Sequence, residues 1–204
     1  MPLPILVRMN QLQRICVFCG SSPGNNPQIN QQAQHLGKVL AQQDIALVYG
    51  AAKIGVMGDV AKGSLNHGGN VIGVIPDFLK LKEVVHLGLT QLITTENMHQ
   101  RKLKMHELSD GFITLPGGFG TFEELFEIIT WAQLGLHQKP IGLLNVDGFY
   151  DDLLEMLQVM VDKGFLKQEN FDLLLVNDEV EALLEQMKTY QAPVIEKWLK
   201  ANRT

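Results

Sequence analysis

The amino-acid sequence predicts an α/β fold: a single domain built on a doubly wound, mostly parallel sheet with helices on both faces. Short apolar runs of strand length alternate with longer segments of helical periodicity along the whole chain of 204 residues. Nearly every short run is apolar throughout, which is typical of parallel strands covered by helices on both sides. The sequence contains no internal repeat and no linker long enough to divide the chain.

The alternation sets the order of the elements. Predicted strands occupy residues 15–19, 45–49, 71–75, 111–115, 141–144 and 173–176. Predicted helices lie at about residues 26–43, 58–67, 97–109, 121–137 and 150–163, and residues 179–201 have the pattern of one or two more. We expect residues 1–13 to form a loose N-terminal arm, because this segment is short and broken by prolines. Residues 14–204 then form the domain, with a helical tail at its C-terminus.

The composition is that of an ordinary globular protein. The 17 Lys and Arg residues against 22 Asp and Glu residues give a formal net charge of −5. Nucleic acid is therefore not an expected partner, because binding to its phosphate backbone needs a strongly basic surface. No apolar stretch reaches the roughly 20 residues of a membrane span, and the N-terminus is too short and proline-broken for a signal peptide. We expect a cytoplasmic protein that does not bind a membrane.

Cys16 and Cys19 both lie in the first predicted strand. Residues three apart on a strand point to opposite faces of the sheet, so the two thiols are not expected to act as a pair. The sequence has no second cysteine pair to complete a metal site, and its histidines and carboxylates do not cluster at the spacing of metal ligands. We expect structural thiols and no metal.

Glycine-rich turns follow three of the predicted strands, at residues 20–24, 50–58 and 116–121. In open α/β sheets, ligands bind outside the carboxyl ends of the strands, and these turns are expected to meet at that edge. The pattern indicates a site for a nucleotide or a phosphate. It matches neither the usual dinucleotide fingerprint nor the P-loop, since both the G-x-G-x-x-G spacing and a Gly-Lys-Ser/Thr ending are missing.

The central motif is Pro-Gly-Gly-Phe-Gly-Thr-Phe-Glu-Glu at residues 116–124, which joins a strand to a helix. Glycines allow the backbone to approach a ligand closely, and the N–H groups at a helix start favour an anion. A second interpretation stays open. Thr121 and Glu124 have the spacing of a capping box, in which Thr121 is the N-cap and Glu124 bonds back to its N–H group.

The second motif is Asn-Met-His-Gln-Arg-Lys at residues 97–102. With Asn97 as the N-cap, Arg101 and Lys102 lie close to the positive end of a helix, where cations are mildly unfavourable. A bound phosphate or a facing carboxylate would reverse the sign, and arginine is suited to both. The alternative is a solvated basic face that continues through Lys104. His99 by itself is more typical of a structural or exposed histidine than of a catalytic one.

Taken together, the two motifs resemble the LOG (lonely guy) family of cytokinin riboside 5′-monophosphate phosphoribohydrolases, proteins long mislabelled as lysine decarboxylases. The likeness extends from about residue 15 to residue 175. It includes Val-Phe-Cys-Gly-Ser-Ser at 17–22, Thr-Trp-Ala-Gln-Leu-Gly at 130–135 and Pro-Ile-Gly-Leu-Leu-Asn at 140–145. One departure is Ala51-Ala52, which stand where the family commonly has glycine, so that an extra methyl group either crowds a ligand or stiffens the turn.

The resemblance implies a Rossmann-like homodimer whose domain, residues 14–204, binds a nucleotide and acts on N6-modified adenosine monophosphates. It implies that Arg101 and Glu124 are the catalytic pair. It also implies a set of substrate contacts, made of Glu83, Lys102, Gly117, Gly118, Phe119, Gly120, Thr121, Phe122, Glu123 and Thr130. No organic cofactor is expected.

The residues themselves fit this chemistry. Breaking an N-glycosidic bond develops positive charge on the ribose, as in glycoside hydrolysis, and a carboxylate such as Glu124 stabilises that charge or activates water. Two other hypotheses stay open: a module that binds a nucleotide without hydrolysing it, and a decarboxylase using pyridoxal phosphate. The latter needs a Schiff-base lysine, and neither Lys53 nor Lys102 has a recognisable context for one.

Overall fold

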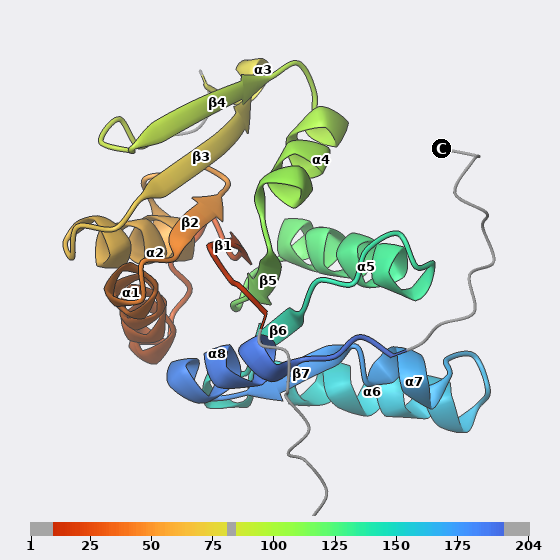
Figure 1. Cartoon of the computed structure of the whole chain (residues 1–204). Helices are drawn as coiled ribbons and strands as arrows, with labels where there is room; N and C mark the ends of the chain where they lie inside the picture. The colour runs from red at the N-terminus through yellow and green to blue at the C-terminus, as the bar shows by residue number, and fades with distance from the viewer. Residues whose placement is uncertain (1–9, 81–84, 194–204) are drawn as a thin grey trace, which may run out of the picture.

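The computed structural model describes residues 10–80 and 85–193. Its centre is a seven-stranded sheet with the order β4-β3-β2-β1-β5-β6-β7, in which every neighbouring pair of strands is parallel (Figure 1). The strands are β1 (Arg14–Phe18), β2 (Ala46–Tyr49), β3 (Val71–Pro76), β4 (Gln91–Thr95), β5 (Gly111–Thr114), β6 (Ile141–Leu144) and β7 (Leu174–Asn177). The predicted fold class, a doubly wound parallel sheet in a single domain, is confirmed.

Helices cover both faces of the sheet (Figure 1). On one face lie α1 (Pro27–Gln42), α2 (Gly55–Leu65) and α8 (Val180–Thr189), and on the other lie α4 (Met98–Leu108), α5 (Phe119–Gln133) and α6 (Asp151–Asp162). Two four-residue helices, α3 (Asp77–Lys80) and α7 (Gln168–Phe171), and a 3₁₀ turn, η1 (Val146–Gly148), complete the described elements. Within residues 10–80 and 85–193, no helix is both long enough and apolar enough to span a bilayer.

The sheet separates two hydrophobic cores. The strand β1 shows why: Ile15 and Val17 belong to the core under α1 and α2, whereas Cys16 and Phe18 belong to the core under α4 and α5. Cys19, just past the strand, joins the first core, so the two free thiols lie on opposite faces, as the alternation along a strand requires.

Strand β4 is the one strand that the sequence did not predict. It pairs only with β3, at the edge of the sheet, and Gln91, Leu92 and Thr94 are exposed. An edge strand with polar residues lacks the continuous apolar run that marked the other six strands. The short α3 and α7 were also missed, because four residues are too few to show helical periodicity.

The two ends of the described chain meet beside α8. Asn10 donates hydrogen bonds from its side chain to the carbonyl oxygens of Met187 (3.0 Å) and Tyr190 (2.8 Å), and Leu12 lies in the first core. Residues 10–13 of the predicted arm are therefore held against the domain. Of the predicted tail, α8 is observed, residues 190–193 are not helical, and the remainder lies outside the described residues.

The topology determines where a ligand can bind. The chain runs outward from β1 to β4 and then returns to place β5 on the other side of β1. The helices that follow β1 and β5, α1 and α5, therefore lie on opposite faces of the sheet (Figure 1), which opens a crevice at the carboxyl edge.

Candidate active site

A cavity of about 680 Å³ occupies this crevice. Its walls come from the turn after β1, the start of α2, the start of α4, the turn between β5 and α5, and the turn after β6. A volume of this size is typical of a small-molecule site. The sequence prediction of a site at the carboxyl edge of the sheet agrees with this position.

Glycines bring the turns after β1 and β5 into backbone contact. The N–H group of Gly20 donates to the carbonyl oxygen of Pro116 at 3.1 Å. A Cβ atom on Gly117 would lie 2.1 Å from Oγ1 of Thr121 and 2.8 Å from the nitrogen of Gly20. Gly117 is therefore required for this close approach, and the two turns form one continuous wall.

Helix α5 begins two residues earlier than expected, and the capping-box interpretation of Thr121 and Glu124 is wrong. The N-cap is Gly118, whose extended backbone (φ −97°, ψ −156°) supplies the turn into the helix, and Thr121 lies buried in the first helical turn. No side chain caps the start of the helix. Because Gly118 and Gly120 have open space where a Cβ atom would lie, the uncapped N–H groups at this end can receive an anion.

The start of α4 places Arg101 at the base of the cavity. As predicted, Asn97 is the N-cap, and its side chain accepts a hydrogen bond from the N–H group of Gln100 at 2.9 Å. Arg101 is buried, with Nε donating to the carbonyl oxygen of Val74 at 3.2 Å. A Cβ atom on Gly50 would lie 2.2 Å from Nη2 of Arg101, so glycine at this position makes room for the guanidinium group.

Glu124 faces Arg101 from α5. Its Oε1 lies 3.8 Å from Nη2 of Arg101, and the two side chains are 11% and 8% exposed. Burial raises the pKa of Glu124 to about 7, against a partial lowering by the guanidinium group. A carboxyl group that titrates near neutral pH, with an arginine to orient it, is suited to general acid–base or charge-stabilising chemistry.

The cavity joins most of the residues that the two motifs predicted. Its lining includes Arg101, Gly117, Gly118, Phe119, Gly120, Thr121, Glu123 and Glu124. Three others lie elsewhere. Phe122 packs against Tyr150, with ring centroids 5.8 Å apart. Thr130 is exposed, and its hydroxyl group donates a hydrogen bond to the carbonyl oxygen of Phe126. Lys102 pairs with Glu123 and Glu127. Glu83 lies outside the described residues.

Other lining residues were not predicted. Met57, Leu79 and Met98 form an apolar end of the cavity on the side of β2 and β3. Asp147, at the opposite end, has a positive φ of 52° and accepts a hydrogen bond from Asn26 at 2.7 Å. The rule that ligands bind past the ends of parallel strands points to Asp147, which follows β6, but no periodicity distinguishes the apolar set.

The alanines that depart from the family pattern are buried beneath the site. Ala51 and Ala52 are fully buried, and neither is part of the cavity lining in the described structure. Ala51 has a positive φ of 68°, the backbone conformation that ordinarily favours glycine. The methyl group of Ala51 thus bears on the turn itself and not on a ligand.

An uncapped helix start beside a buried carboxyl–guanidinium pair, at the switch point of a Rossmann-like sheet, defines an enzyme with a site for an anionic substrate. The comparisons with known proteins give the particular family. A family model described as "Possible lysine decarboxylase" matches residues 57–187. A cytokinin riboside 5′-monophosphate phosphoribohydrolase of Arabidopsis thaliana is 44% identical over 181 residues, covering 89% of this chain and 85% of its own. The chain belongs to this family, the LOG family of phosphoribohydrolases.

A rice relative agrees with this assignment. The cytokinin riboside 5′-monophosphate phosphoribohydrolase of Oryza sativa subsp. japonica is 43% identical over 183 residues, which cover 90% of this chain and 76% of the relative. The chain is thus an enzyme of the phosphoribohydrolase class.

Solved structures share the fold at lower identity. A molybdenum cofactor binding protein from Rippkaea orientalis superposes with a TM-score of 0.67 at 22% identity, covering 88% of this chain and 97% of that one. A Moco carrier protein from Chlamydomonas reinhardtii gives 0.65 at 22% identity, covering 87% and 98%. At these identities the likeness concerns the fold alone.

Proposed function

We propose that the protein hydrolyses the N-glycosidic bond of N6-modified adenosine 5′-monophosphates and releases a free, cytokinin-type base and ribose 5-phosphate. The observation that carries this proposal is the buried pair of Arg101 and Glu124 beside the uncapped start of α5. A site that only holds a phosphate has no need of a carboxylate next to the anion. The plant relatives, which are named for this reaction, support the same conclusion.

The geometry suggests a pose for the substrate. The 5′-phosphate accepts hydrogen bonds at the start of α5, around Gly118 to Thr121. The ribose then lies over Arg101 and Glu124, and the base extends toward the apolar end formed by Met57, Leu79 and Met98. An apolar substituent on the base suits that end. Binding of the remote phosphate helps to hold the reacting bond in place.

The reaction needs one water molecule and no redox step. The C1′–N bond breaks, its electron pair leaves with the base, and positive charge develops on the ribose. The ionised Glu124 stabilises this charge and accepts a proton from the attacking water, whose oxygen bonds to C1′. The departing base takes up a proton from solvent, and Glu124 returns its proton to solvent before the next turnover. Arg101 orients Glu124 and contacts the substrate.

The test is release of ribose 5-phosphate from a panel of nucleoside monophosphates, nucleosides and lysine, with Glu124→Gln and Arg101→Ala alongside the wild type. We expect release from a monophosphate but not from the nucleoside, and a loss of about a hundredfold or more in each variant, since each removes a group that acts on the transition state. The base of the best substrate identifies the preferred modification.

The same panel separates the alternatives. Nucleotide binding without any product would replace the proposal with a binding module. Amine release from lysine, with a pyridoxal absorbance band, would favour a decarboxylase, although no lysine lies among the described lining residues of the cavity.

We further propose a cytoplasmic homodimer. Several exposed apolar side chains belong to α4, α5, α6 and the turn after α5. These helices lie on one side of the sheet (Figure 1). They are Leu103, Phe126, Leu134, Leu136, Met156, Val159 and Met160. Exposed apolar side chains on neighbouring elements are typical of an interface, and a two-fold interface with a second copy of the chain would cover them. Sedimentation of Met156→Glu against the wild type tests this: a monomer is expected for the variant.

A further inference from the structure

We propose that Lys102 is a positioning residue, which keeps Glu124 ionised by holding two neighbouring carboxylates of α5 and does not contact the substrate. This inference rests on the proposed function, because it assigns Lys102 a part in the same reaction. It differs from the substrate contact that the family resemblance implies for this residue.

The contacts of Lys102 are the first support. Its Nζ pairs with Glu123 and lies 2.9 Å from Oε1 of Glu127. Only 9% of its side chain is exposed, so it is fixed between α4 and α5. Burial lowers the pKa of the ammonium group, but the hydrogen bonds to Glu123 and Glu127 outweigh it, and the net shift is upward. The lysine therefore remains a cation, and its hydrogen bonds go to the protein.

The second support is the arrangement of charges. Helix α5 carries Glu123, Glu124 and Glu127 within about one turn. The facing helix α4 carries two consecutive cations, Arg101 and Lys102, which pair with these carboxylates. The two cations contact different carboxylates. Arg101 contacts Glu124, whereas Lys102 contacts Glu123, which also lines the cavity, and Glu127. Lys102 is absent from the cavity lining in the described structure.

This arrangement bears on the protonation of Glu124. Burial is the main cause that raises its pKa; Arg101 lowers it, Glu123 and Glu127 raise it, and Lys102 lowers it. Without Lys102, Glu124 would share α5 with two unpaired carboxylates, and its ionised form would become less favourable. A reaction that needs the ionised carboxylate would then require a higher pH.

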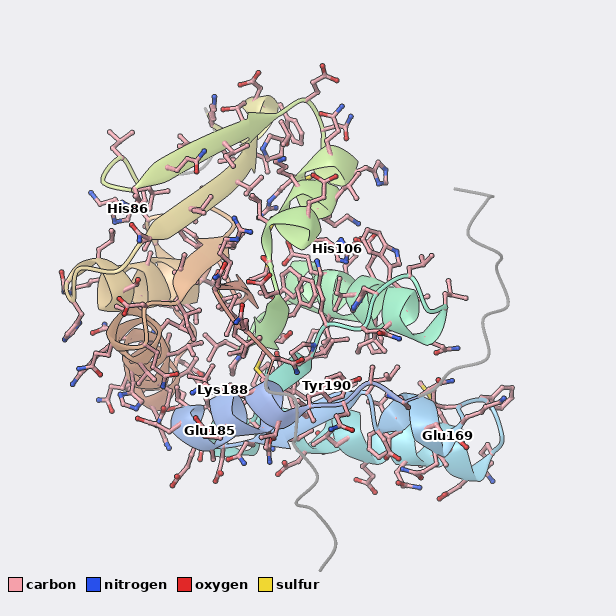
Figure 2. All side chains as sticks on the ribbon, viewed as in Figure 1. His86, His106, Glu169, Glu185, Lys188 and Tyr190 are labelled. Atoms are coloured by element: carbon pink, nitrogen blue, oxygen red, sulfur yellow. The ribbon has the colours of Figure 1, made fainter. Side chains whose placement is uncertain are left out.

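Burial moves the pKa values of several other titratable side chains away from that of Glu124. Cys16 and Cys19 approach from β1, and burial raises the pKa of each thiol well above its ordinary value. His106, which Figure 2 labels between α4 and α5, stacks near Phe112 and His137, and burial lowers its pKa to about 4. Burial also lowers the pKa of His137. The substrate phosphate, whose second pKa is about 6, affects every variant equally, so a difference between two acid limbs reports on Glu124 and the charges around it.

The experiment compares the pH profile of kcat/KM for the full-length wild type with that of Lys102→Met. We expect the acid limb to move up by about one pH unit, which is about a tenfold loss at pH 6 and a small loss at pH 9. Lys102→Arg should keep the wild-type profile. The matched control is Lys104→Met, which removes a cation from the same helix but one that pairs with the exposed Glu107 at 3.3 Å, and its profile should not move.

A double variant sharpens the test. Lys102→Met combined with Glu127→Gln removes one positive and one negative charge, and its acid limb should return toward that of the wild type. A contact with the substrate cannot be restored in this way. A rise in KM of equal size at every pH, without rescue by Glu127→Gln, would overturn the proposal and support a substrate contact.

A measurement that does not depend on activity tests the role of Lys102 even if the proposed function is wrong. If the wild type releases no ribose 5-phosphate, the titration of Glu124 can be followed by NMR of ¹³C-labelled glutamate, with Glu124→Gln to assign the signal. An upward shift of that titration in Lys102→Met supports the electrostatic role without any activity. An unchanged titration refutes it.

Discussion

The two faces of the sheet hold their helices in different ways. On one face, α1 and α2 touch through their backbones: a Cβ atom on Gly37 would lie 2.1 Å from the carbonyl oxygen of Val60, and one on Gly63 would lie 2.0 Å from that of Gln34. On the other face, α4 and α5 are bridged by long charged side chains, at 3.8 Å between Arg101 and Glu124 and 2.9 Å between Lys102 and Glu127.

The difference separates stability from chemistry. Backbone contact through glycines is closely packed and leaves no room for a ligand or a titratable group. A bridge of buried charges is weak evidence for stability, because desolvation opposes the attraction. It does, however, place a carboxyl group of raised pKa at the edge of a cavity. Four predictions test this comparison.

The largest expected effect is on the α1–α2 contact. Gly63→Ala should lower the free energy of unfolding by about 3 kcal/mol, because the new methyl group meets a backbone carbonyl that can move only with its helix. Urea denaturation measures it. Gln31→Ala, on the exposed side of α1, is the control and should change stability by less than about 0.5 kcal/mol. Equal effects in the two variants would show that the contact is not tightly packed.

Gly50→Ala, on the other face of the sheet, should lower activity more than it lowers stability. The new Cβ atom meets the end of the Arg101 side chain, which can move, so the fold should persist. Displacement of the guanidinium group should lower kcat/KM by about a hundredfold, as misplacement of a catalytic group by about 1 Å can do. Activity and thermal unfolding are measured together; a loss of stability with unchanged activity would contradict the prediction.

The buried charge itself should lower stability at alkaline pH. In the folded state the pKa of Glu124 is about 7, above its ordinary value of 4.5, so its contribution to stability is complete below about pH 4.5 and is lost as pH rises through 7. Glu124→Gln should therefore be more stable than the wild type at pH 8, by on the order of 1 kcal/mol. The difference should vanish at pH 4. A variant less stable at pH 8 would mean that the pair with Arg101 stabilises the fold.

The smallest effect concerns the turn after β2. Ala51→Gly should raise the free energy of unfolding by less than about 1 kcal/mol, since glycine adopts a φ of 68° without strain. Ala52→Gly is the control, because Ala52 is not among the residues with positive φ, and it should lower stability. Kinetics should be unchanged in Ala51→Gly; an altered KM would show that the turn shapes the ligand site.

The sequence predicted much of this molecule. Apolar runs predicted six of the strands, and the two motifs contain Arg101, Glu124 and the glycines of the turn after β5, which the structure brings together in one cavity. These strands and turns could be predicted because a buried parallel strand and a ligand-binding turn each have a local pattern of composition and spacing. Strand β4 could not be predicted from the sequence, because an exposed edge strand has no such pattern.

What the tertiary structure decided was which groups face each other. Thr121 and Glu124 fit a capping box in sequence, but the extended Gly118 starts α5 earlier and turns Glu124 toward Arg101. Arg101 and Lys102 are neighbours in sequence, yet Arg101 lines the cavity, whereas Lys102 pairs with Glu123 and Glu127 of α5 and is not part of the described lining. Consecutive residues on a helix point about 100° apart, so their partners depend on the helix packed opposite, which no local pattern specifies.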